Sequence, residues 1–316
     1  MIDNEPNADS AQQQDDFERY FQENIEPLVD EDNMIKRRYH GRFWAFFWSV
    51  GFFICMNALI ALFNTLMHGK PFNYQLLCLV SLCAFSIVFF PIFSYYRHKR
   101  TDIFDIFLRY YGDWKHGQHK EVQLVHSPVI PAHDFVSSSH DISSSYQGVD
   151  IEVRDTIYTK KIGPSNWNWR RKVSGGVILY LTFPEKFKQT ILMFEKNGFM
   201  RKNKFNNMQS RTAIIDVPVA NYFNIFCSDD EYIRRLLRSS FFESLLDMKD
   251  ALKAKHVYVE INENYMRVYF ENSTLYIDNY KFWSKTLNKE KFRQLNSVLE
   301  SIFAYIEVFN FLLRNF

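Results

Sequence analysis

The sequence is poor in glycine and proline and carries none of the common catalytic fingerprints. No GxGxxG or GxxxxGK[ST] motif occurs, so the signatures of dinucleotide binding and of a P-loop are missing, and Gly175-Gly176 is not a phosphate cradle. A GxSxG elbow and an HExxH helix are also absent. The chain therefore shows no signature of a known catalytic class, and it predicts no cofactor.

Cysteine and histidine are too few and too widely spaced to predict a disulfide framework or a metal site. The four cysteines form no CxxC pair, and three of them lie in apolar sequence, as is typical of a reducing compartment: Cys55, Cys78, Cys83 and Cys227. Four histidines recur every seven residues, whereas ligand pairs on a helix are four apart: His119, His126, His133 and His140.

Charge is missing from two long segments. Residues 43–69 hold no charged side chain, and residues 71–96 form a second apolar run. A helix needs about 20 apolar residues to cross a bilayer. We therefore predict transmembrane helices at 43–67 and 72–96, in preference to buried core helices, with aromatic residues at their ends in the interfacial belt.

Basic residues flank this pair of segments, and the turn between them offers only His68 and Lys70. The flanking cations are Lys36, Arg37, Arg38 and Arg42 before the first segment, and Arg97, Lys99 and Arg100 after the second. By the positive-inside rule, both termini are predicted to be cytoplasmic. No signal-peptide pattern precedes the first segment.

The residues before the first apolar segment are acidic. Residues 1–35 hold eleven acidic residues and one basic residue. We expect 1–14 to be a disordered tail and 15–40 to be a cytoplasmic amphipathic helix. That helix packs on the protein's own domain or, alternatively, binds a partner. The rest of the chain is only mildly basic, so nucleic acid is not an expected partner.

After the second apolar segment the sequence predicts an α+β domain over 119–316, entered through a juxtamembrane helix at 101–118. Polar residues 126–145 are typical of a loop. Alternating apolar residues predict strands in 146–161, 175–183, 189–198 and 222–227, and a hairpin over 257–270. Helical periodicity predicts helices from 228 to about 255 and from 288 to the end. The expected sheet is largely antiparallel.

The residues between two of these strands form a possible interaction loop. It contains Trp167, Trp169, Arg170 and Arg171. Such a loop suits a membrane interface or a protein partner. The alternative is a hairpin tip whose tryptophans fold back on the sheet.

The stretch "FCSDDEYIRRLL" (226–237) admits two interpretations. Ser228 and Glu231 fit a capping box, with Asp229 and Asp230 in the first turn of the helix. The alternative is a hydrolase or transferase site in which the two aspartates act with Arg234 or His256.

The ordered set of segments resembles a bacterial membrane-protein family known as domain of unknown function 3137. The resemblance rests on the two-span hairpin, "YQGVDIEV", "GGVILYLTFPEKFKQTILMF", "FNIFCSDDEYIRRLLRSSFFESLLDMK" and "VYVEINENYMRVYF". The longer Trp/Arg loop and a lysine- and asparagine-rich insert depart from it. The resemblance implies an inner-membrane protein with this architecture and carries over no catalytic residue.

We therefore expect a non-enzymatic integral inner-membrane protein whose cytoplasmic α+β domain binds a protein partner or a second copy. One alternative is the membrane-tethered enzyme using Asp229 and Asp230. Another is an oligomeric transporter component with Asn57 facing inward, although neither apolar segment holds the ionisable residues that mark ion pathways. A secreted effector inserting into a host membrane is also open.

Overall fold

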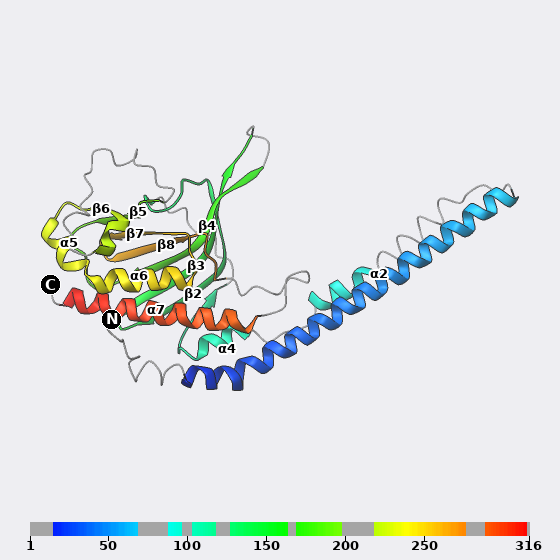
Figure 1. Ribbon diagram of the computed structural model, residues 1–316, viewed down its shortest axis with the longest axis horizontal. Coiled ribbons are helices and arrows are strands. Elements are labelled where there is room, and N and C mark those ends of the chain that lie inside the picture. Colours follow the sequence, from blue (N-terminus) through cyan, green and yellow to red (C-terminus); the bar gives the residue numbers. More distant parts are fainter. Residues whose placement is uncertain are drawn as a thin grey trace. The chain divides into compact units, whose positions relative to one another are not determined.

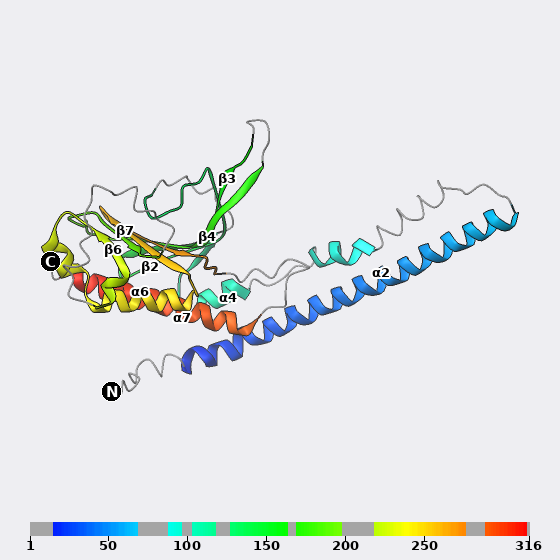
Figure 2. The ribbon, with the colours of Figure 1, turned by 45° about the horizontal axis from the view of Figure 1, so that its top comes forward.

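A computed structural model describes residues 15–68, 88–96, 103–117, 127–163, 169–197, 218–275 and 288–314. The chain divides into two compact units. The first contains the N-terminal helices as far as Phe107, and the second contains the sheet and the helices packed on it. Figures 1 and 2 show both units as ribbons.

The first unit contains one helical run from residue 15 to residue 68. A π-helical turn, η1 (Phe21–Ile25), leads directly into α2 (Glu26–His68). The 43 residues of α2 extend about 65 Å at 1.5 Å per residue. Sequence reasoning placed an amphipathic helix and a transmembrane helix in succession, and here they form one helix without a break between residues 40 and 43.

The start of this helical run packs on α4 (Ile103–Arg109), which lies next to it within the first unit. The rings of Phe17 and Phe107 meet edge to face at 6.1 Å. The Tyr20 hydroxyl donates a hydrogen bond of 2.8 Å to the Ile106 carbonyl. The apolar stripe expected in the acidic arm is therefore buried against the protein's own chain.

A second helical segment, residues 88–96, runs antiparallel to α2. Tyr95 lies beside Tyr39, with ring centroids 5.9 Å apart, and Phe89 lies 6.5 Å from Phe43. Residue numbers rise along α2 from Tyr39 to Phe43 while those of their partners fall from Tyr95 to Phe89, so the two helices run in opposite directions. Phe43 and Tyr95 are both buried in a small cluster that these contacts form.

The second unit is built on an eight-stranded sheet in the order β1-β2-β3-β4-β8-β7-β5-β6, in which all the strand pairs are antiparallel. The strands are β1 (Lys115–Gly117), β2 (Phe135–Tyr146), β3 (Val149–Lys161), β4 (Arg170–Thr182), β5 (Ile191–Glu195), β6 (Phe223–Phe226), β7 (His256–Asn262) and β8 (Tyr265–Glu271). The predicted α+β fold with a largely antiparallel sheet is confirmed.

Helices cover one face of this sheet, as Figures 1 and 2 show. They are α5 (Asp230–Leu236), α6 (Ser239–Ala251) and α7 (Lys289–Arg314), and a short helix η4 (Pro218–Tyr222) precedes β6. The rings of Phe241 on α6 and Tyr305 on α7 pack in a tilted arrangement with centroids 5.4 Å apart, and the Tyr305 hydroxyl lies 3.2 Å from the Met266 sulfur on β8. These contacts form the main core.

Two sequence expectations at the start of this unit are wrong. Residues 135–146 are not loop but the strand β2, which lies between β1 and β3. Its serines conceal the strand because β2 has few apolar side chains and is held by backbone pairing, with β3 along most of its length and with β1 at residues 141–143. The helix expected over 101–118 ends at Arg109, and after a turn through Gly112 (φ 98°) the chain forms β1.

The helix expected from 228 to about 255 is two helices. Leu237 and Arg238 interrupt it with non-helical backbone, at ψ 79° and ψ 172°. Leu236 and Leu237 are both almost fully buried. The change of direction keeps apolar periodicity on both sides of the break, so periodicity alone does not reveal it.

Two glycines are required by the sheet. Gly148 (φ 82°) follows Gln147 (φ 50°) in the two-residue turn between β2 and β3, and two positive φ angles define a type I′ turn. At Gly176 a Cβ would lie 2.0 Å from the Phe270 carbonyl oxygen, so only glycine lets β4 approach β8 this closely. This is the structural role of the Gly175-Gly176 pair.

The face of the sheet opposite the helices buries an ion pair. Arg267 on β8 donates a hydrogen bond of 2.6 Å to Glu260 on β7, and both side chains are 7% exposed. Ser127 donates a second bond of 2.5 Å to the same carboxylate oxygen. The Arg267 guanidinium also lies over the rings of Tyr180 and Tyr265 at 5.1 and 5.2 Å.

Replacing Arg267 with Met leaves the Glu260 carboxylate buried without its cation. We expect a loss of about 3–5 kcal/mol in unfolding free energy, measured by denaturation of the detergent-solubilised chain. The double variant Arg267→Met/Glu260→Gln removes both charges and is expected to regain most of that loss. A double variant as unstable as the single one would contradict this account.

Candidate functional site

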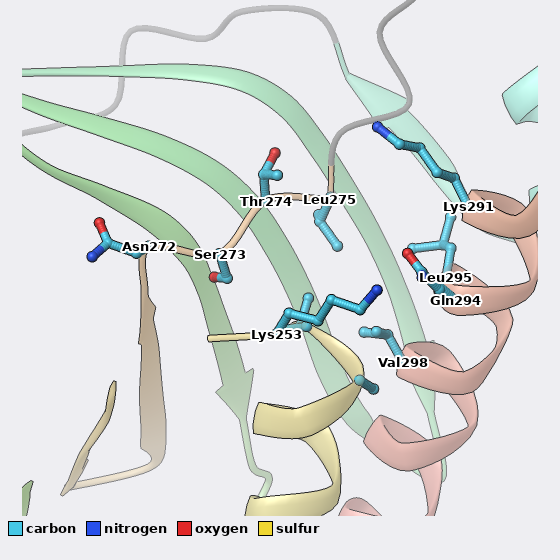
Figure 3. A pocket seen from close by; sticks show the side chains of 11 residues that line it. Lys253, Asn272, Ser273, Thr274, Leu275, Lys291, Gln294, Leu295 and Val298 are labelled. Carbon is cyan, nitrogen blue, oxygen red and sulfur yellow. The ribbon is translucent and has the colours of Figure 1, made fainter. Parts of the chain in front are cut away.

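A small pocket opens between the end of α6, the first turns of α7 and the segment after β8 (Figure 3). Its volume is about 190 Å³. It is lined by Ala251, Leu252, Lys253, Asn272, Ser273, Thr274, Leu275, Lys291, Gln294, Leu295 and Val298. Figure 3 shows Lys253 reaching from the end of α6 toward α7, where Gln294 lies. The lining combines cationic and neutral polar groups over an apolar floor.

Two residues of this pocket have left-handed backbone. Lys253 (φ 51°) ends α6, where the Ala254 amide bonds back to the Lys249 carbonyl. Asn272 (φ 57°) ends β8, and its amide donates to the Gly175 carbonyl at 2.8 Å. Both conformations serve to terminate an element, which accounts for them without a ligand.

A buried carboxyl lies beside the pocket. Asp155 on β3 is 6% exposed and accepts a hydrogen bond of 2.5 Å from Thr274, which lines the pocket. Burial raises the pKa of Asp155 from 3.8 to about 6, and the opposing effects of Thr274 and Lys172 are smaller. Burial therefore makes the ionised form of Asp155 less favourable than it is in water, although that form still predominates at pH 7. The hydroxyl beside Asp155 is that of Thr274, and the lining residues of the pocket include no histidine or cysteine.

A larger recess of about 840 Å³ lies at the β1 end of the sheet. It is lined by Tyr111, Asp113, Trp114, Lys115, Ser143, Ser144, Ser145, Asp150, Ile151, Glu152, Tyr180 and Thr182. Ser144 pairs with Ile151 and Ser143 with Glu152, so these neighbouring pairs point to opposite faces of the sheet. The recess lies where β2 continues beyond its pairing with β1, which ends at Ser143.

The predicted capping box at 228–231 is wrong in its residues. Asp229 is the N-cap of α5, and its carboxylate accepts a hydrogen bond of 2.9 Å from the Tyr232 amide. Ser228 instead donates to Gln189 at 2.6 Å, and Glu231 pairs with Arg235 one turn along. The helix begins one residue later than the S-x-x-E pattern indicates, because aspartate is as good a cap as serine.

The alternative enzyme site uses Asp229 and Asp230 with Arg234 or His256, and of these two partners His256 does not converge with Asp229. His256 lies 3.7 Å from Glu195, which pairs with Phe223 at the start of β6. Asp229 follows the other end of that strand. The four residues of β6 extend about 10 Å, so Glu195 and His256 lie near one end of this strand and Asp229 beyond the other. Lys249 also binds Glu195, at 2.8 Å, so His256 lies beside a structural ion pair of Lys249 and Glu195.

The predicted basic flanks are only partly within the described residues. Arg37, Arg38 and Arg42 are exposed, whereas Lys36 is only 2% exposed. Arg97, Lys99 and Arg100 lie outside the described residues, as do His119 and His126. Among the residues that the structure describes, no group of three potential ligands could hold a metal ion.

Two of the four residues of the predicted interaction loop lie in a strand. Trp167 lies outside the described residues, and Trp169 is 64% exposed. Arg170 and Arg171 belong to β4, where they lie opposite Lys161 and Lys160 of β3. We call residues 160–163 and 169–173 the β3–β4 arm, which projects from the sheet in Figures 1 and 2.

The arm carries an electrostatic cost. Each pair of like charges directly opposed across two strands destabilises them by roughly 0.2–1 kcal/mol. Two contacts partly compensate. The Arg170 guanidinium lies 4.0 Å from the centre of the Phe135 ring, and the Asp134 carboxylate accepts a hydrogen bond of 2.8 Å from the Lys161 amide.

Sequence reasoning missed Asp155 and the opposed cations. Asp155 continues the alternation of Val149, Ile151 and Val153, so its period marks it as facing the core. The opposition of the arm cations can be predicted only when the strand register is known, because the register decides which residues of β3 and β4 face each other.

Residues 173–311 match the model of a family described as "Protein of unknown function (DUF3137)". The chain thus resembles this family over the part from β4 to α7, as its sequence indicated. No curated protein matches the chain. A solved structure, "crystal structure of the mycobacterial trehalose monomycolate transport factor A, TtfA", is 10% identical, with a TM-score of 0.35 over 62% of this chain and 91% of that chain. A likeness of that degree supports no conclusion about function.

The cap at Asp229 predicts a specific order of effects at the start of α5. Asp229→Ala is expected to cost about 1 kcal/mol of unfolding free energy, whereas Asp229→Asn keeps an acceptor and costs less. Ser228→Ala loses only a solvent-exposed bond and is expected to cost least. Denaturation of the three variants in detergent measures the order. A larger loss of unfolding free energy for Ser228→Ala than for Asp229→Ala would support Ser228 as the cap and contradict this assignment.

Asp155 predicts a pH-dependent stability. Its pKa is higher in the folded chain than in the unfolded one, so the folded state binds the proton more tightly and loses stability as pH rises from about 4 to about 6. Asp155→Asn is expected to remove this dependence, gaining up to about 3 kcal/mol relative to the native chain at pH 7 and little at pH 4. Denaturation at both pH values measures the difference. The exposed Asp150→Asn on the same strand is the matched control and should leave the dependence intact.

Proposed function

We propose that this chain is an integral membrane protein, anchored by a two-span hairpin, whose α+β domain is a non-enzymatic interaction domain. One observation carries the membrane part. The helical run from Asp15 to Met67 is long and apolar enough to span a bilayer, and the apolar window within it is 0% buried. Trp48, Phe52 and Leu66 are 69%, 71% and 75% exposed.

Exposure on this scale is unfavourable in water. Burying a large apolar side chain is worth roughly 1.5–3 kcal/mol, and α2 leaves many such side chains uncovered. Its uncharged part, residues 43–68, extends about 39 Å at 1.5 Å per residue, which exceeds the roughly 30 Å of hydrocarbon. Lipid would cover these side chains.

The second span is supported by the antiparallel packing of residues 88–96 on α2. Most of the second apolar run lies outside the described residues, so the hairpin as a whole rests on its sequence and on this contact. The exposed cations Arg37, Arg38 and Arg42 favour a cytoplasmic start of the first span. The family resemblance favours a bacterial inner membrane.

An interaction domain fits the second unit better than an enzyme does. Within the described residues, the pocket beside Asp155 is lined by no histidine or cysteine, and its Ser273 hydroxyl is bonded to the Val177 amide and the Phe270 carbonyl. Asp229 is occupied as a helix cap. The domain would bind a protein partner or a second copy. A transporter is less well supported, because the Asn57 side chain donates to the Phe53 carbonyl of its own helix at 2.8 Å.

Cysteine labelling tests the anchor and its orientation. In a chain whose four native cysteines are replaced by serine, single reporters are placed at Gly69, between the proposed spans, and at Lys186, in the domain. With intact spheroplasts, a membrane-impermeant maleimide is expected to label Gly69→Cys. It should label Lys186→Cys only after permeabilisation, because the bilayer separates the two positions.

Alkaline carbonate extraction is the control for integration, and the chain should stay in the membrane pellet. Release into the supernatant would contradict the anchor. Equal labelling of both reporters in intact spheroplasts would contradict the orientation.

A further inference from the structure

The β3–β4 arm leaves the sheet as a two-stranded ribbon. Beyond Thr159, which pairs with Phe135, β3 has no further partner in β2. Likewise β4 pairs with β8 only from Gly176 onward. Among the described strands, the arm therefore has only its own two strands to hold it. An isolated pair of strands is marginal in water.

The charge of the arm makes this isolation more unfavourable. Residues 157–173 contain five cationic residues and no acidic one: Lys160, Lys161, Arg170, Arg171 and Lys172. Four of these are arranged as directly opposed pairs. The nearby Asp134 accepts a hydrogen bond from the Lys161 amide, and Asp155 attracts Lys172. An external anionic surface would relieve the repulsion.

Apolar side chains are interleaved with these cations. Ile162 is 43% exposed, Trp169 is 64% exposed and Val173 is 43% exposed. The Ile162 amide donates to the Trp169 carbonyl at 2.9 Å, so these two residues face each other at the end of the arm. Because side chains alternate along each strand, Ile162 lies on the same face of the arm as Lys160, and Trp169 on the same face as Arg171.

We propose that the β3–β4 arm binds the anionic surface of the bilayer in which the chain is anchored. The cations attract acidic lipid headgroups, and Trp169 and Ile162 enter the interfacial layer, where tryptophan is enriched. This inference rests on the proposed membrane anchor, which keeps the domain close to such a surface. An acidic protein partner would neutralise the charges of the arm but would not explain why Trp169 and Ile162 are exposed beside them.

Hydrogen–deuterium exchange of the full chain in lipid nanodiscs tests the proposal. One set of discs contains phosphatidylcholine alone, and in the other roughly one lipid in four is phosphatidylglycerol. Exchange of peptides from 157–173 is expected to be about tenfold slower in the anionic discs. Raising the salt from about 0.1 M to about 1 M shortens the screening length from roughly 10 Å to roughly 3 Å and should abolish the difference.

Matched variants separate the arm from general surface charge. Lys160→Gln/Arg171→Gln/Lys172→Gln is expected to remove the lipid dependence, and Trp169→Ser to reduce it. Lys186→Gln/Lys188→Gln/Lys255→Gln removes three exposed lysines elsewhere on the same domain and should retain it. The arm variants lie outside the core, so peptides from β7 and β8 should exchange as in the native chain.

Two outcomes would overturn the proposal. Equal exchange of the arm in both lipid compositions excludes binding to anionic lipid. Protection that is independent of lipid but rises with the number of chains per disc assigns the arm to contact between copies. Failure of the anchor is distinguishable, because the chain would then be released by carbonate before any disc is assembled.

Discussion

The pairing of β4 with β8 holds the second unit together. Strands β1 to β4 follow one another in sequence order, and β5 to β8 form the other half of the sheet. Within the described strands, β4 and β8 join the two halves. The join is tight at Gly176, and bonds at both of its ends reinforce it: Ser273 accepts from the Val177 amide, and the Phe183 amide donates to the Asn264 carbonyl. The helices and the polar face are positioned by this pairing.

The second unit places its charges differently on its different surfaces. On the face opposite the helices, Glu260 and Arg267 are buried as a pair, so their attraction offsets the cost of leaving water. On the helix face, Asp155 is buried beside the Thr274 hydroxyl and takes up a proton more readily, with Lys172 opposing this only in part. On the arm, Lys160 and Lys161 lie opposite Arg171 and Arg170. Only the first arrangement buries opposite charges in direct contact.

Apolar periodicity predicted the elements that bury side chains. The β7–β8 hairpin, with its two-residue turn, and the closing helix α7 agree with the sequence, because alternation and helical period survive in buried positions. The strand β2 was missed because serine carries no such signal. The cap at Asp229 was misplaced by one residue, since Ser228 and Asp229 have the same capping chemistry. The candidate pocket was beyond prediction, because its lining comes from three segments that only the fold brings together.

The unbroken helix from residue 15 to residue 68 couples two environments mechanically. Its apolar half carries the side chains proposed to face lipid, and its polar half buries Phe17 against α4. A continuous helix is stiff over this length, so a rotation at one end is transmitted to the other. A change of bilayer thickness or of a neighbouring helix would turn the apolar half about its axis. The polar half would then turn with it, which would strain the packing of Phe17 against α4.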